Sequence, residues 1–129
     1  MAYLGEFEQL VLFSILHVEG EAFGLAIRET IEERTGREVS SGAIYTTLGR
    51  LEKRGFVSSH VRESTERRAG RPRKYYEIEP EGARALHGSY ESIQAAARGL
   101  IPKLAKRVGG MSLNDPTKAN PVRPALPAR

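Results

Sequence analysis

Hydrophobic positions recur at helical spacing through the first half of the chain and predict three helices. The first, over 5–18, is apolar on nearly every face, which indicates burial from more than one side, against its own domain and a partner subunit. A second is expected over about 22–35, before a glycine of the kind that ends helices. A third begins at residue 40 or 41, where a serine can cap it, and runs to about 54. Its inward face carries Ile44, Leu48 and Leu51.

Two short strands are expected next, over 56–62 and 75–79, because β-branched and aromatic residues are frequent in both. The segment between them, 63–74, is too polar to be buried and should form the tip of a hairpin. Three helices followed by a hairpin with a long basic tip predict a winged helix-turn-helix, a mainly α fold with a small β-hairpin.

Apolar residues after Pro80 follow a heptad spacing and predict a last helix. They step alternately by three and four residues through Ala83, Leu86, Tyr90, Ile93, Ala97, Leu100 and Leu104. This seam predicts a dimerisation helix over 80–108, with packing onto its own domain as the alternative. A kink or an end is expected near residues 99–101, before Pro102. We therefore divide the chain into a DNA-binding domain (1–79), the dimerisation helix and a disordered tail (109–129).

The charge is concentrated in one segment. Residues 53–74 hold eight basic and two acidic side chains, whereas residues 1–52 hold four basic and nine acidic ones. An acidic body with one strongly basic segment suits a polyanion such as nucleic acid.

Composition excludes several classes of protein. The chain has 129 residues, net charge +4, no cysteine and three histidines without metal-ligand spacing, so we expect no disulfide, metal site, cofactor or enzymatic activity. Its longest apolar stretch is too short to span a bilayer and no secretory signal opens it. We therefore expect a cytoplasmic protein without a membrane partner.

The outward face of the third helix is small and polar at its start and basic further on. This pattern is typical of a helix that lies close to DNA, with an ordinary amphipathic surface helix as the alternative. The residues expected to contact DNA are Ser40, Ser41, Gly42, Thr46, Arg50 and Lys53 in this helix, and Arg68, Arg71, Arg73 and Lys74 in the basic tip. The tip also contains Gly-Arg-Pro-Arg at 70–73, which resembles the core of AT-hook minor-groove binders and predicts minor-groove or phosphate contact.

From residue 4 to 104 the chain resembles the PadR family of bacterial transcriptional regulators. The likeness lies in the motifs GEFEQLVLFSIL, FGLAIRETIEERTG, VSSGAIYTTLGRLEKRGFV and GRPRKYYEIEPEG. It implies a homodimer of the short subgroup with one C-terminal helix, and a palindromic operator, usually bound as a repressor. It also implies that the Tyr45 hydroxyl bonds a phosphate. Glu79 stands where the family usually has a capping threonine, and the chain lacks the tryptophan with which some members bind aromatic drugs.

These observations predict a sequence-specific DNA-binding transcriptional regulator, a homodimeric repressor of a palindromic operator. Its dimer contacts are expected from Leu10 and Phe13 of the first helix and from Leu86, Tyr90, Ile93, Ala97, Leu100 and Leu104 of the seam. The alternative is a winged-helix module whose basic wing contacts a protein or structured RNA. A small apolar effector between two subunits fits this architecture, but no residue set identifies one.

Overall fold

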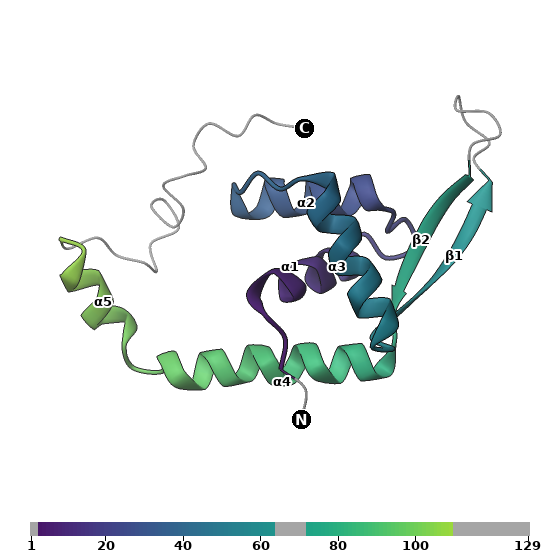
Figure 1. The fold of residues 1–129 in the computed structure, drawn as a ribbon. Coiled ribbons are helices and arrows are strands. Elements are labelled where there is room, and N and C mark those ends of the chain that lie inside the picture. Colours follow the sequence, from purple (N-terminus) through teal and green to yellow (C-terminus); the bar gives the residue numbers. More distant parts are fainter. Residues whose placement is uncertain (1–2, 64–71, 110–129) are drawn as a thin grey trace.

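The structure is a computed structural model that describes residues 3–63 and 72–109. This part of the chain forms a mainly helical fold with one antiparallel hairpin (Figure 1). The elements are α1 (Glu6–His17), α2 (Gly24–Thr35), α3 (Ser41–Lys53), β1 (Val57–Glu63), β2 (Pro72–Ile78), α4 (Pro80–Ala97) and α5 (Ile101–Arg107). The winged-helix fold expected from the sequence is confirmed. Across the described residues, no helix combines the length and apolarity needed to cross a membrane.

Helices α1, α2 and α3 pack on one another around the hydrophobic core. The predicted inward face of α3 is fully buried, since Ile44, Leu48 and Leu51 are each 0% exposed. The core also contains Val11, Leu12 and Ile15 of α1, Ile27 and Ile31 of α2, Phe56, Val57 and Tyr76 of the hairpin region, and Ala85 and Leu86 of α4. Burial of these side chains holds α3 in place while leaving its opposite face in solvent.

Helix ends follow the signals in the sequence. The Ser40 hydroxyl caps α3 by accepting a hydrogen bond from the Ala43 amide at 3.0 Å. Gly36 ends α2 with a φ of 74°, in the left-handed region that favours glycine. Glu79 precedes α4 without a side-chain cap hydrogen bond, as expected where the usual threonine is replaced.

Helix α2 begins at Gly24, two residues later than predicted, because the preceding residues pair with the hairpin. The Tyr76 amide donates a hydrogen bond to the Ala22 carbonyl at 2.9 Å, and Phe23 forms an antiparallel bridge with Tyr75. This pairing extends the backbone before α2 and anchors the hairpin to the helical body.

The hairpin, which we call the wing, is longer than predicted. Residues 72–74 were expected in the polar tip but belong to β2, and Glu63 belongs to β1. The strand pairing continues through Arg62↔Arg73 to Glu63↔Pro72. These pairs lie at the solvent-exposed end of the hairpin, where backbone hydrogen bonds can form between strands whose side chains are polar. Pro72 is tolerated since it is the first residue of its strand.

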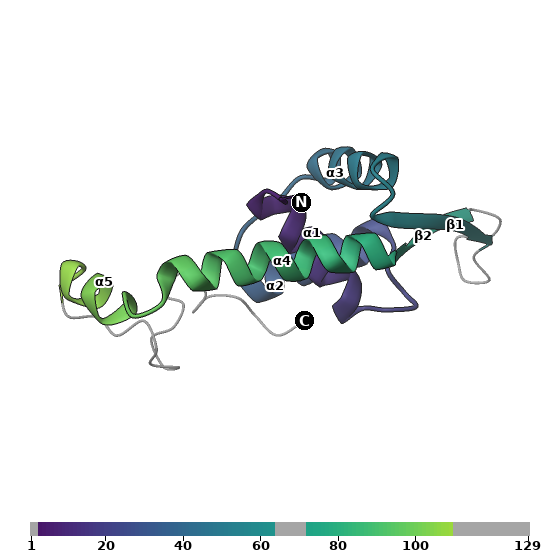
Figure 2. The same cartoon turned by 90° about the horizontal axis from the view of Figure 1, so that it is seen from below.

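The predicted C-terminal helix is two helices. Helix α4 runs along the body and ends at Ala97. Arg98 and Gly99 then form a turn in which Gly99 has a φ of 82°, and α5 turns away from the axis of α4 (Figures 1 and 2). The kink or end predicted near residues 99–101 is confirmed, and it divides the region predicted as one helix over 80–108. Leu86 is 4% exposed in the core of its own chain, so it is not available to a second subunit. Only Gly109 of the predicted tail lies within the described residues.

Candidate nucleic-acid interface

The outward face of α3 carries the polar residues that the sequence singles out. All of them are exposed: Ser40, Ser41, Gly42, Tyr45, Thr46, Arg50 and Lys53. Hydroxyl groups and a glycine occupy its first turn, and the basic residues follow toward its end. This face can therefore approach a surface closely at its start and offer positive charge further along.

Arg50 and Lys53 differ in their ion pairing from the neighbouring cation Arg54. Arg54 points back to the body and pairs with Glu8 of α1 at 3.2 Å. Neither Arg50 nor Lys53 forms an ion pair within residues 3–63 and 72–109. Two uncompensated positive charges thus project from the outward face of α3, where they attract an anion.

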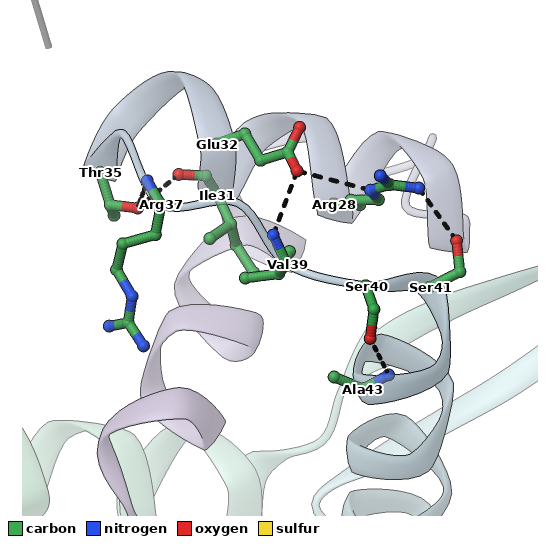
Figure 3. Close-up of polar contacts among 9 residues, drawn as sticks. All are labelled: Arg28, Ile31, Glu32, Thr35, Arg37, Val39, Ser40, Ser41 and Ala43. Atoms are coloured by element: carbon green, nitrogen blue, oxygen red, sulfur yellow. Dashed lines mark hydrogen bonds and ion pairs between the residues drawn. The ribbon is translucent and has the colours of Figure 1, made fainter.

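A polar network holds the start of α3 against α2 (Figure 3). Arg28 of α2 donates a hydrogen bond to the Ser41 hydroxyl at 3.1 Å, and its Nε lies 3.5 Å from a Glu32 carboxylate oxygen. The same oxygen accepts a hydrogen bond from the Val39 amide at 3.2 Å. These contacts set the turn between the two helices, and with it the direction of α3. Sequence reasoning missed Arg28, whose only local signal is its spacing of four residues from Glu32.

Tyr45 projects from α3 toward the start of α2 and the wing. It lies so close to Gly24 that a Cβ at that position would overlap its ring and hydroxyl. Tyr45, Gly24, Arg73 and Lys74 are among the residues that line an open notch of about 280 Å³. The notch therefore joins side chains of α3 to side chains of the wing at one place on the surface.

The two basic residues of β2 have different surroundings. The Arg73 guanidinium stacks over the Phe23 ring, 4.2 Å from its centroid. Lys74 Nζ lies 3.9 Å from a carboxylate oxygen of Glu52, at the end of α3. Sequence reasoning missed Glu52. Of the predicted wing contacts, Arg68 and Arg71 lie outside the described residues.

The described residues contain no group of three or more His, Cys, Asp or Glu side chains that could hold a metal ion. The groups that the site does present are guanidinium, ammonium and hydroxyl donors. Such donors bind the oxygen atoms of phosphates and the acceptor atoms of bases.

The sequence profile of the PadR-like family of transcriptional regulators matches residues 12–88. The chain belongs to this family. The match runs from within α1 into α4 and includes the whole of α3 and the wing. Membership makes this PadR-like chain a DNA-binding transcriptional regulator, and the family is one of regulators rather than enzymes.

Solved structures share the fold of this PadR-like chain. A transcriptional regulator from Clostridium thermocellum is 27% identical, with a TM-score of 0.58 over 70% of this chain and 82% of that one. A PadR-like regulator from Bacillus cereus is 23% identical, with a TM-score of 0.61 over 81% and 92%. A PadR family regulator from Eggerthella lenta is 24% identical, with a TM-score of 0.54 over 81% and 87%. No curated protein is a significant match to the chain.

Proposed function

We propose that this PadR-like regulator is a homodimeric repressor that binds a palindromic operator in duplex DNA. In the proposed complex α3 enters the major groove, and the wing follows the flanking backbone or the minor groove. The contacts come from the exposed residues of α3 described above and from the basic residues of the wing. Residues 1–79 then serve as the DNA-binding domain, and residues 80–108 as the dimerisation region.

The observation that carries this proposal is the outward face of α3. Its first turn is free of bulky side chains at Ser41 and Gly42, so the helix backbone can come close to base edges. Further along, Arg50 and Lys53 are exposed without an acidic partner among the described residues. A helix of this kind beside a basic hairpin matches the geometry of major-groove reading with flanking phosphate contacts.

The proposal of a dimer is based on apolar side chains of α4 and α5 that are exposed to solvent. Tyr90, Ile93, Leu100 and Leu104 are 44%, 62%, 44% and 49% exposed. The last three, with Ala97, are among the residues that line an apolar groove of about 420 Å³ where the two helices meet. An apolar patch of this kind is typical of an interface. A two-fold dimer presents α3 twice, which favours an operator of two matching half-sites.

Leu10 and Phe13 of α1 stay in the proposed interface as partly buried residues at the edge of the core. The Phe13 ring packs edge-on against the Tyr90 ring, with centroids 5.7 Å apart, so it is continuous with the exposed surface of α4. Leu86 is left out because it is buried in its own chain. A small apolar effector in this region stays a prediction.

The test is fluorescence anisotropy with labelled duplexes at two salt concentrations. The first duplex is the DNA upstream of the protein's own gene, since many repressors control themselves, and a scrambled duplex is the control. We expect binding at least about a hundredfold tighter to the upstream duplex, with a log–log salt slope of about −5 or steeper. Equal binding to both duplexes would argue against an operator in that fragment. No binding to either at low salt would instead favour a protein partner.

Tyr45→Phe should lower operator affinity by about tenfold, because it removes one hydrogen bond to a charged phosphate. The ring that packs over Gly24 is kept, so the fold should be unaffected. Tyr3→Phe makes the same chemical change at a residue that is 65% exposed and far from α3 in sequence, and should bind as wild type. Affinities are measured by anisotropy at one salt concentration. Wild-type affinity in Tyr45→Phe would mean that the hydroxyl does not contact the DNA.

A further inference from the structure

Glu52, in the last turn of α3, contacts both strands of the wing. The Ser59 hydroxyl of β1 donates a hydrogen bond to its carboxylate at 2.6 Å. Lys74 Nζ of β2 lies 3.9 Å from its other carboxylate oxygen. The Glu52 side chain therefore links α3 to both strands of the wing.

The wing residues around Glu52 share one face of the hairpin. The register pairs Ser59 with Tyr76 and Val61 with Lys74, so Ser59, Lys74 and Tyr76 lie on the same face. Burial raises the pKa of the Tyr76 hydroxyl, and the nearby charges of Glu52 and Tyr45 raise it further. This face of the wing is therefore the one turned toward α3.

A carboxylate at this place lowers DNA affinity through its charge, because it repels phosphates. Its ion pair contributes little to stability, since the side chains of Lys74 and Glu52 are 51% and 37% exposed. The Ser59 hydrogen bond is short and charge-assisted, and such bonds fix geometry well. The main effect of Glu52 is then the position of the wing relative to α3.

We infer that Glu52 is a positioning residue that raises operator specificity by holding the wing at a fixed offset from α3. The inference rests on the proposed function. At an operator, the bases read by α3 and the phosphates contacted by the wing are separated by a fixed distance along the DNA. A wing already held in place relative to α3 loses less conformational entropy when it binds there. Nonspecific binding is electrostatic and needs no such register, so there the carboxylate only repels. Removing Glu52 should weaken operator binding and strengthen binding to other DNA.

The experiment compares two duplexes by anisotropy: one selected by the wild-type protein from a random library, and a scrambled version of it. Glu52→Ala should lower the ratio of operator to scrambled affinity by about tenfold. Ser59→Ala keeps the charge but loses the hydrogen bond, so operator affinity should fall about threefold while scrambled affinity is unchanged. Glu52→Gln keeps an acceptor for Ser59 and should retain most of the ratio while binding both duplexes more tightly.

Glu77→Ala is the matched control for the loss of charge. Glu77 is an exposed acid on the other face of β2, without an ion pair to another described residue. Its removal should raise affinity for both duplexes alike and leave the ratio unchanged. If Glu52→Ala behaves in the same way, its effect is one of charge alone, and the inference is overturned.

A measurement without DNA separates this inference from the proposed function. In the free protein, Glu52→Ala should raise amide hydrogen exchange in β1 and β2, and unchanged exchange would overturn the link between helix and wing. A wild-type protein that does not discriminate between the duplexes refutes the proposed function and this inference with it. A wild type that discriminates, together with a wild-type ratio in Glu52→Ala, refutes this inference alone. Urea unfolding shows whether each variant is folded. If Glu52→Ala does not fold, the operator and scrambled affinities of Ser59→Ala test the inference instead.

Discussion

Ile93→Glu should convert the protein from a dimer into a monomer and lower operator affinity by at least about a hundredfold. In the isolated chain Ile93 is 62% exposed, so a glutamate there stays solvated and the fold of the chain is preserved. In the proposed dimer the same position is buried against a second subunit. An unpaired charge buried at an interface costs several kcal/mol, and two-fold symmetry places a second one nearby. The monomer then keeps the contacts of one half-site only.

Sedimentation velocity gives the oligomeric state of this variant, and anisotropy gives its operator affinity. Ala95→Glu is the matched control, because Ala95 is exposed on α4 but lies outside the heptad seam. It should remain a dimer with wild-type affinity. If Ile93→Glu is still a dimer, the subunits associate elsewhere. Leu16 of α1, which is 40% exposed, would then be the next position to change.

Beyond the order of the elements, sequence reasoning predicted best the features that are decided within one helix. The face of α3 is an example, since Ile44, Leu48 and Leu51 repeat at helical spacing and all three are buried. The heptad pattern of α4 was harder to interpret. It identifies an apolar stripe, but periodicity does not tell whether the stripe is buried by the same chain or by a second one. Leu86 is buried by its own chain and Ile93 is not, and that difference depends on which part of α4 packs against the helical body.

The residues that orient the candidate site were missed because their contacts join separate elements. Arg28 contacts Ser41, which is 13 residues away in the sequence, and Glu52 contacts Lys74 on the far strand of the wing. Neither pair has a periodic or motif signal. The α3 residues proposed to contact DNA could be predicted from the sequence because they lie together on one exposed face of a single helix. Those that set the direction of that face become visible only once the elements have packed.

Gly82→Ala should lower the free energy of unfolding by about 2–3 kcal/mol. Gly82 is buried in the first turn of α4, and a Cβ there would overlap the backbone carbonyl of Phe56. That carbonyl cannot move aside easily, because it also accepts the Glu79 amide hydrogen bond at 2.8 Å. Alanine would favour the helix by about 0.5–1 kcal/mol, which is less than the expected steric cost. The start of α4 would then have to shift away from the base of the wing.

Urea unfolding followed by circular dichroism measures this change, and Gly49→Ala is the matched control. Gly49 lies in α3, and apart from its chain neighbours and the adjacent backbone of its own helix no heavy atom lies within 4 Å of the added Cβ. Alanine should therefore stabilise the protein by about 0.5–1 kcal/mol. Opposite signs for the same substitution would show that the close approach of α4 to Phe56, rather than helix propensity, decides the result at Gly82. A stabilised Gly82→Ala variant would mean that α4 does not pack this closely in solution. The exposed apolar residues from Tyr90 onward would then not be held at a fixed position relative to α3. The dimer would no longer set the distance between its two α3 helices, and with it the spacing of the two half-sites.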